Sequence, residues 1–203
     1  MKTHDQQLET PPFFQGAAAV CHWLNHALAA AIRSPGDPWH QGPITYLCDA
    51  QTPTTKTIVW RGWDAAGTGI LDFYTDTRSA KWRALRANRA MSALFYCPQR
   101  LVQLTLKGQA HTSAGTDQDL ALFHQLGADQ MAAYQSVTPP GTPFTDQTRP
   151  STKTIDPGLG AQYFGRVRLH CTSFDCVSLN PQGHQRLIGS SILDPNSCLW
   201  ICP

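Results

Sequence analysis

The sequence predicts an α+β fold in which an antiparallel β-barrel carries peripheral helices. Short apolar runs of strand length follow one another from residue 44 to residue 110, and turn residues separate them. A segment with helical periodicity precedes these runs, and other helical segments lie between or after them. Strand-like runs return from residue 163 onward. Short, turn-separated strands at this density are typical of an antiparallel barrel.

The first element expected is a helix over residues 14–33, which ends before Ser34-Pro35. His22 and His26 lie four residues apart on this helix, a spacing that metal ligands use. No H-E-x-x-H motif accompanies them, so a surface pair is the favoured interpretation. The apolar residues at helical spacing are Ala17, Val20, Leu24, Leu28 and Ile32.

The other elements are expected in the following order. Strands are expected at residues 44–48, 55–63, 69–75, 91–96 and 101–110, with a basic helix at 78–87. Residues 117–135 are expected to be helical in two pieces, with a break at Gly127. A long loop rich in Pro, Thr and Gly covers 137–160, and strands follow at 163–169, 175–179, 185–193 and 199–201.

The bulk composition is that of one globular domain. The chain has 203 residues, of which 41% are hydrophobic and 15% are charged, which is enough for a full core. The mostly polar start ends in Pro11-Pro12, so we expect a disordered N-terminus at 1–12 and a single domain at 13–203. The net charge of +2 is too small to indicate a nucleic acid or an acidic membrane surface as partner.

Membrane and metal functions are not indicated by the sequence. No apolar run approaches the ~20 residues that cross a bilayer, and the start lacks a secretory signal, so we expect a cytoplasmic protein. The seven cysteines are odd in number and form no C-x-x-C pair, so they are interpreted as core residues in a reducing compartment. Cys198 and Cys202 lack a partner motif for a metal, and we expect no metal site.

The chemistry-bearing part of the chain is the start of the helix at 78–87. Arg78 and Lys81 lie at its N-terminal end, where positive side chains repel the helix dipole. A bound anion would remove this conflict, because a helix N-terminus offers unpaired N–H groups to phosphate, and Ser79 can add a hydrogen bond. The spacing alone leaves a second interpretation open, an ordinary solvated basic helix with Ser79 near its cap.

An ordered set of motifs from Lys56 to Gly108 resembles the pyridoxamine 5′-phosphate oxidase-related family of FMN-binding split barrels. That family has a basic residue, an apolar strand and a second basic residue before Gly, then Phe-Tyr-Thr-Asn/Asp, Ser-Arg-Lys and a later Gln in a strand that ends in Gly. The matching residues here are Lys56, Arg61-Gly62, Phe73-Tyr74-Thr75-Asp76, Ser79, Lys81, Gln103 and Gly108. The resemblance covers about a quarter of the chain in order and spacing, and it implies a Greek-key split barrel.

The resemblance also implies FMN as cofactor and assigns residues to it. Lys81, Ser79 and Lys56 are expected at the phosphate, with Arg78 as a substitute for the family Arg at Ala80. The segment Thr57-Ile58-Val59 is expected along the flavin, with Arg61 near the ring. Tyr74, Thr75 and Gln103 are expected as ring or ribityl contacts. The family site lies between two subunits, and Gln135-Ser136 resembles a Gln-Ser that reaches the cofactor from the second subunit, so we expect a homodimer.

The vitamin B6 substrate site of the family is largely missing from this sequence. Leu122 and Leu126 stand on the helix where the oxidases carry Tyr and Arg for the substrate phosphate. Ile188 replaces a family His in the C-terminal motif, of which only Arg186 remains. The sequence is therefore closer to the branch of the family with unassigned substrates.

Three functions are compatible with this pattern. The first is an FMN-dependent oxidoreductase that acts on a small molecule, with Arg186 and His184 as candidates for orienting the substrate. The second is a non-enzymatic protein that binds a flavin or another flat ligand. The third, pyridoxamine 5′-phosphate oxidase, is disfavoured by the missing substrate contacts. Fold alone does not choose among them.

Overall fold

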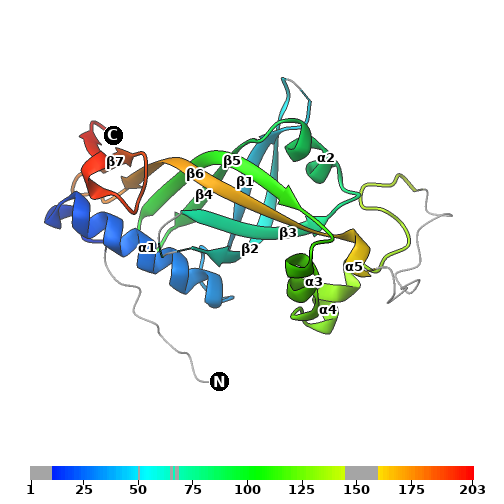
Figure 1. The fold of residues 1–203 in the computed structure, drawn as a ribbon. Helices are drawn as coiled ribbons and strands as arrows, with labels where there is room; N and C mark the ends of the chain where they lie inside the picture. The colour runs from blue at the N-terminus through cyan, green and yellow to red at the C-terminus, as the bar shows by residue number, and fades with distance from the viewer. Residues whose placement is uncertain (1–10, 50, 65, 67–68, 145–159) are drawn as a thin grey trace.

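A closed antiparallel barrel organises the computed structural model, which describes residues 11–49, 51–64, 66, 69–144 and 160–203 (Figure 1). In this part of the chain the barrel strands are β1 (Gln41–Leu47), β2 (Pro53–Trp63), β3 (Ile70–Asp76), β4 (Ala90–Cys97), β5 (Val102–Ser113) and β6 (Phe164–Ser178). They lie in the order β3-β2-β1-β4-β5-β6, and a further pairing of β3 with β6 closes the barrel. This Greek-key order confirms the predicted fold class.

The C-terminal strands β7 (Gln185–Gly189) and β8 (Leu199–Ile201) extend the sheet from β6. The helices are α1 (Ala17–Arg33), α2 (Ala80–Ala87), α3 (Asp117–His124), α4 (Ala128–Ala132) and α5 (Gly160–Tyr163), with short 3₁₀ turns η1 (Phe13–Gln15) and η2 (Pro195–Ser197). Figure 1 shows α1 beside β7 at one end of the barrel and α2–α5 toward the other end. The predicted break at Gly127 is confirmed, since it separates α3 from α4.

One predicted boundary was wrong, because the expected strands at 163–169 and 175–179 are a single strand, β6. Thr172 has no partner in the register with β5, which passes from Lys107–Ser173 to Gly108–Cys171. This bulge shifts the alternation, so from Gly165 onward the buried residues have odd numbers before it and even numbers after it. In the sequence, two stretches whose apolar positions alternate out of phase with each other look like two separate strands. Gly108 permits the close approach, because a Cβ there would overlap the carbonyl oxygen of His170.

Two smaller corrections concern the ends of elements. Tyr163 belongs to the short helix α5, whereas a strand was expected to begin there. The expected strand at 185–193 ends at Gly189, and Ile192 turns back into the core with 4% of its surface exposed. Most of the expected disordered N-terminus, residues 1–10, lies outside the described residues. The single domain at 13–203 stays a prediction.

An aromatic cluster fills the barrel between α1 and the strands. Trp60 is fully buried and stacks on Phe95 at 5.3 Å between ring centroids, with Phe73 edge-on at 5.9 Å. Trp39 contacts Phe95 at 5.7 Å. Aromatic rings of this size contribute strongly to core stability. Because they fill the interior, polar side chains lie at the strand ends and on the outer face of the barrel. None of the helices in the described residues is long and apolar enough to span a bilayer.

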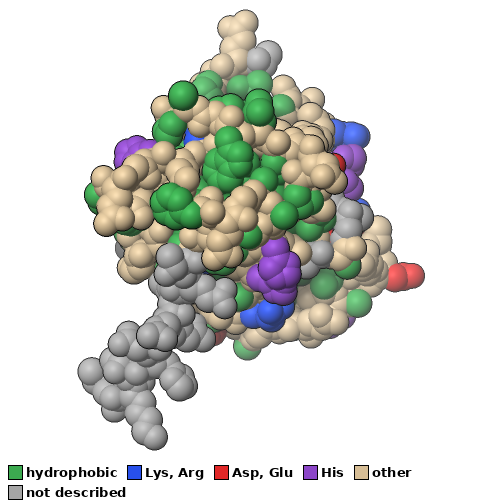
Figure 2. Space-filling view, turned by 90° about the vertical axis from the view of Figure 1, so that its left-hand side faces the viewer, with side chains coloured by type: hydrophobic (Ala, Val, Ile, Leu, Met, Phe, Trp, Pro, Cys, Tyr) green, Lys and Arg blue, Asp and Glu red, His purple; other side chains and the backbone are tan. Residues whose placement is uncertain are grey.

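The end of the molecule formed by α1 and the C-terminal strands carries exposed apolar side chains. Figure 2 shows hydrophobic groups gathered on this face. Phe14 is 81% exposed, Leu199 61% and Trp200 40%, and the Trp200 ring lies 6.2 Å from that of Phe13. This apolar face lies at the opposite end from α2 (Figure 1).

Candidate functional site

Lys81 and Lys56 form a cationic pair where α2 meets the barrel. Lys81 follows the N-cap of α2 by two positions, and its amine lies 5.2 Å from the centre of the Phe73 ring. Burial lowers the pKa of Lys81 to about 8, and the positive charge of Lys56 adds to this shift. Among the described residues, no carboxylate forms an ion pair with either lysine. A half-buried amine beside a like charge fits an anionic ligand.

Ser79 is the N-cap of α2, as its side chain accepts a hydrogen bond from the Trp82 N–H at 3.2 Å. Its hydroxyl lies 3.4 Å from that of Thr75, which is buried at the end of β3. The cap interpretation from the sequence is therefore confirmed, and it does not exclude a ligand. A serine oxygen that accepts from the backbone still carries an O–H group that can donate to an anion near Lys81.

Arg78 precedes the cap and is engaged within the protein. Its Nη2 lies 2.6 Å from Oδ2 of Asp76, and its Nε donates to Oδ1 of the same carboxylate at 3.0 Å. Its Nη1 donates to the Ser136 carbonyl at 2.9 Å, and its guanidinium lies 3.7 Å from the Tyr163 ring centre. Arg78 thus ties the segment after α4 to the end of β3. Its role as a phosphate ligand stays a prediction.

Arg61 and Tyr74 belong to a second cluster, on the outer side of β2 and β3. Arg61 lies at a bulge in β2, between Trp60 and Gly62. Burial raises the pKa of Tyr134 to about 12, and the charge of Arg61 opposes this shift. Burial also raises the pKa of Tyr74, against the charges of Arg166 and Arg61. Arg61 is therefore close to both phenol rings, and each of these rings also contacts Phe164, at 4.8 and 5.3 Å between ring centroids.

Arg166 on β6 completes this second cluster and was not predicted from the sequence. Its Nη2 lies 2.6 Å from Oδ2 of Asp72 on β3. Its Nε and Nη1 are buried and have no hydrogen-bond partner among the described residues, as is also true of Oδ1 of Asp72. Unsatisfied buried donors are costly, so this guanidinium fits a ligand that presents oxygen atoms. The available signal was the outward alternation of Arg166 and Arg168 within one strand.

The segment of β2 predicted to lie along the flavin, Thr57-Ile58-Val59, has side chains on both faces of the sheet. Ile58 is only 7% exposed and faces the core, so its side chain is a packing group. Thr57 and Val59 alternate with it and face outward. Only the backbone of Ile58 is therefore available to a ligand on the outer face.

Gln103 lies away from both clusters within one chain. It pairs with Tyr96 of β4, and β1 stands between β4 and β2. Three strand spacings separate β5 from β2 in either direction around the closed barrel. The structure therefore does not bring Gln103 together with Lys81 or Arg61 of the same chain.

The two residues proposed to orient a substrate lie further along the same sheet. Arg186 on β7 pairs with Asp175 at 2.6 and 2.9 Å, and this contact raises its pKa. His184 is exposed in the turn before β7. On α1, the exposed rings of His22 and His26 lie 4.3 Å apart, and within the described ranges no group of three metal-binding side chains occurs.

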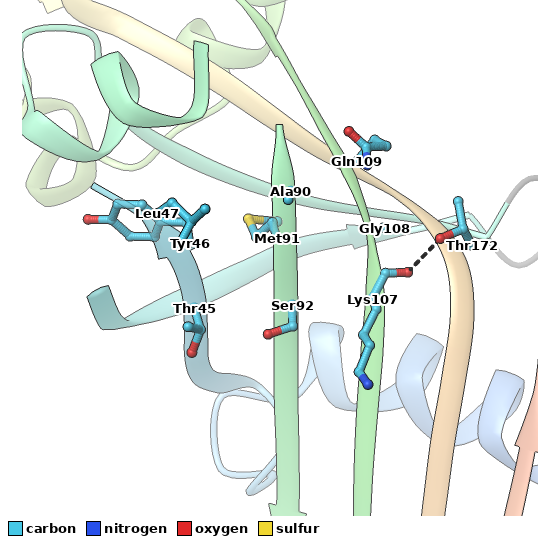
Figure 3. Close-up of a pocket in the computed structure, with 10 residues that line it drawn as sticks. All are labelled: Thr45, Tyr46, Leu47, Ala90, Met91, Ser92, Lys107, Gly108, Gln109 and Thr172. Atoms are coloured by element: carbon cyan, nitrogen blue, oxygen red, sulfur yellow. Dashed lines mark hydrogen bonds between the residues drawn. The ribbon is translucent and has the colours of Figure 1, made fainter. Parts of the chain in front are cut away.

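A groove of about 510 Å³ opens on the outer face of the barrel, apart from the predicted cofactor residues (Figure 3). Lys107 extends along it, and the Thr172 hydroxyl donates to the Lys107 carbonyl at 3.4 Å. The groove residues are Thr45, Tyr46, Leu47, Ala90, Met91, Ser92, Lys107, Gly108, Gln109 and Thr172. In this groove, polar side chains and Lys107 lie beside Tyr46 and Met91. The groove is therefore a second surface that could receive a ligand or another chain.

Comparisons with known proteins agree with this architecture. Residues 21–114 match the family model described as pyridoxamine 5′-phosphate oxidase, FMN-binding domain. A curated pyridoxine/pyridoxamine 5′-phosphate oxidase of Acinetobacter baumannii is 30% identical over 120 residues, which are 59% of this chain. The match covers 51% of that relative, so the chain spans about half the length of the curated protein it matches.

Solved structures show the same fold. A pyridoxamine 5′-phosphate oxidase-related, FMN-binding protein of Nostoc punctiforme has a TM-score of 0.69 at 23% identity, over 89% of this chain and 95% of that one. PhzG of Burkholderia lata, in complex with tetrahydrophenazine-1-carboxylic acid, has a TM-score of 0.66 at 18% identity, over 100% and 97% of the two chains. The predicted resemblance is confirmed: this chain has the split-barrel fold, and its residues 21–114 resemble the FMN-binding domain of pyridoxamine 5′-phosphate oxidases.

Proposed function

We propose that this protein binds FMN and acts as an oxidoreductase on a small molecule other than a vitamin B6 phosphate. The observation that carries the proposal is the Lys56–Lys81 pair. Lys81 is held half-buried and close to a second positive charge, which weakens the fold unless an anion lies between them. The match of residues 21–114 to an FMN-binding domain supports the FMN phosphate as that anion.

The donor set of the described residues fits the parts of FMN. Lys56, Lys81 and the Ser79 hydroxyl would hold the phosphate, as cations and a hydroxyl at a helix start do. Thr57 and Val59 offer an outward strand surface to the ribityl chain and the ring. Arg61 and the unsatisfied nitrogens of Arg166 would bind the polar edge of the ring. When bound, FMN supplies the group that accepts or donates a hydride.

A second copy of the chain completes the proposed site. Gln103 matches a family cofactor contact but lies three strands away from β2 of its own chain. In a two-fold symmetric dimer, one surface meets the same surface of the partner, so Gln103 of one chain can reach the clusters of the other.

A non-enzymatic flavin-binding protein is the second candidate function, and one observation favours it. Arg186 is neutralised by Asp175, and His184 is exposed to solvent, so neither candidate presents a free polar group beside the two clusters. The two functions differ in the absorption spectrum of the FMN-loaded protein. Bleaching of the flavin bands by NAD(P)H, followed by recovery with an acceptor, supports the enzyme, whereas an unreactive flavin supports the binding protein.

The first prediction is that Lys81→Met stabilises the FMN-free protein at pH 7. The folded pKa of about 8 lies below the unfolded value, so below pH 8 the charged amine destabilises the fold. We expect a gain of about 1–2 kcal/mol in urea unfolding, which is less than the whole shift because the amine is partly exposed. The gain should decline from about pH 8 upward and disappear above the unfolded pKa of about 10.4, where the amine is neutral in both states. Lys107→Met, at an exposed lysine, is the control, and a less stable Lys81→Met protein would contradict the prediction.

The second prediction separates phosphate binding from ring binding. Lys81→Ala should weaken FMN binding by ~1.5–3 kcal/mol, or roughly 10-fold to 150-fold, and Lys56→Ala should act in the same direction. Riboflavin lacks the phosphate, so its affinity should stay unchanged in both variants. Fluorescence titration with the two flavins measures both effects, with Lys107→Ala as control. An equal loss for riboflavin and FMN would remove Lys81 from the phosphate site.

The third prediction concerns sharing of the site between two chains. Lys81→Ala and Gln103→Ala homodimers should each bind FMN weakly, while subunit exchange between them should restore tight binding in about a quarter of the sites. Half of the dimers would then be mixed, and one of their two sites would carry neither substitution. Sedimentation verifies the dimer, and titration counts the tight sites. A monomer with full FMN affinity, or no restored sites after exchange, would show that one chain forms the site alone.

The fourth prediction is that the FMN-loaded protein does not oxidise pyridoxamine 5′-phosphate at ordinary enzyme rates. The side chains of Leu122 on α3 and Leu126, which lies between α3 and α4 rather than on the expected helix, offer no hydrogen-bond donor, and burying a phosphate against them is costly. Ile188 removes a further polar contact. Losing two or three contacts to a charged group lowers efficiency by several orders of magnitude. Turnover of about 1 per second or more with oxygen would contradict this assignment.

A further inference from the structure

Two cysteines from opposite ends of the chain lie beside each other in the fold. The sulfur of Cys21 on α1 is 3.5 Å from that of Cys198, which follows η2. This distance exceeds a disulfide bond by about 1.5 Å, which a small rotation of the side chains can close. A covalent link between them would join the N-terminal helix to the C-terminal strands across 177 residues of sequence.

The local structure holds the sulfur of Cys198 toward α1. The η2 turn is capped by Asp194, and the backbone N–H of Cys198 donates to the Pro195 carbonyl at 3.2 Å. Gly189 leaves the room that the thiol occupies, since a Cβ at this position would lie 3.0 Å from the Cys198 sulfur. The pair is therefore built by a capped turn and a missing side chain.

A cavity borders one residue of this pair, Cys21, and the other residue, Cys198, is itself partly exposed. A cavity of about 460 Å³ lies between α1 and the segment before η2, and Cys21, His22, Asn25, Ile192, Leu193 and Pro195 line it. Cys198 is half-buried, whereas Cys21 is 1% exposed. Burial raises the pKa of Cys21 to about 12, and the neighbouring Cys198 adds to the shift, so Cys21 keeps its proton. Cys198 is thus the sulfur that meets an oxidant first.

We propose that Cys21 and Cys198 form a reversible disulfide when the protein meets a peroxide. Cys198 releases its proton and its sulfur attacks one peroxide oxygen, the O–O bond breaks, and the departing hydroxide takes up that proton, so a sulfenic acid and one water form. The Cys21 sulfur then attacks the Cys198 sulfur, the S–S bond forms, and the hydroxyl leaves with the proton of Cys21 as a second water. Two thiols are oxidised and one peroxide is reduced. A dithiol reductant reverses the link.

The expected consequence is a fold that resists unfolding when it is oxidised. A disulfide that closes almost the whole chain restricts the unfolded state strongly. For a domain of this size we expect a rise in Tm of roughly 5–15 °C after oxidation. This effect does not depend on FMN, so the proposal stands or fails independently of the proposed function.

The experiment treats the reduced full-length protein with hydrogen peroxide and measures intact mass, peptide maps and Tm. We expect a loss of about 2 Da, a linked pair of peptides that contain Cys21 and Cys198, a higher Tm, and full reversal by dithiothreitol. No mass loss, or a link between other cysteines such as the nearby buried Cys176, would overturn the proposal.

Cysteine variants test which of the two sulfurs reacts with the peroxide first. In Cys21→Ser the sulfenic acid has no resolving thiol, so dimedone should label Cys198. In Cys198→Ser, dimedone should leave Cys21 unlabelled. Cys48→Ser and Cys202→Ser, at exposed cysteines, are the controls and should form the disulfide like the wild type. Labelling of Cys21 in Cys198→Ser would overturn the order, and a disulfide that persists in both pair variants would overturn the site.

Discussion

The pairing of β3 with β6 is the contact on which the candidate site depends. It closes the barrel through a register that runs from Ile70–His170 to Asp76–Phe164. The same pairing sets Arg166 beside Asp72 and leaves two guanidinium nitrogens for a ligand. It also fixes Asp76, whose carboxylate orients Arg78 just before the cap of α2. The positions of the helix start and of Lys81 thus follow from the closure of the sheet.

The distribution of paired and unpaired cations shows where a charged ligand group can bind. In the described residues, the ion pairs join Arg78, Arg100, Arg166 and Arg186 to aspartates. Lys56 and Lys81 have no such partner, although Lys81 is the lysine with the lowered pKa. The arginine side chains therefore form ion pairs that stabilise the fold, whereas the Lys56–Lys81 pair remains available to an anion. A stable protein would not keep Lys81 in this position for packing alone, since a neutral side chain of similar length packs there without the cost of burying a charge.

Local signals in the sequence predicted local features of the fold. The periodicity of α1, the cap at Ser79 and the break at Gly127 each depend on residues within one or two helical turns, and all three are present. The candidate site residues at 56–61 and 74–81 could likewise be chosen from the sequence, because their motifs follow one another in a fixed order within one stretch of the chain.

Features that depend on distant pairing could not be predicted in this way. The ion pair of Arg166 with Asp72 and the thiol pair of Cys21 with Cys198 join residues that are 94 and 177 positions apart. Gln103 illustrates the converse, because it belongs to the same motif set as Lys81 but lies three strands away from β2. A motif gives the kind of residue that a site needs, whereas the sheet order decides where in the fold that residue lies.

The unpaired Thr172 gives β6 a change of phase within one continuous strand. Before it, Arg166 and Arg168 face outward with even numbers, and after it Asp175 faces outward with an odd number and can meet Arg186. A single additional residue thereby lets one strand serve the barrel at its beginning and the appended C-terminal sheet at its end. Loss or gain of one residue between 164 and 178 would exchange inner and outer side chains over half of the strand. During divergence of such proteins, this strand can therefore accept many substitutions but hardly any change in length.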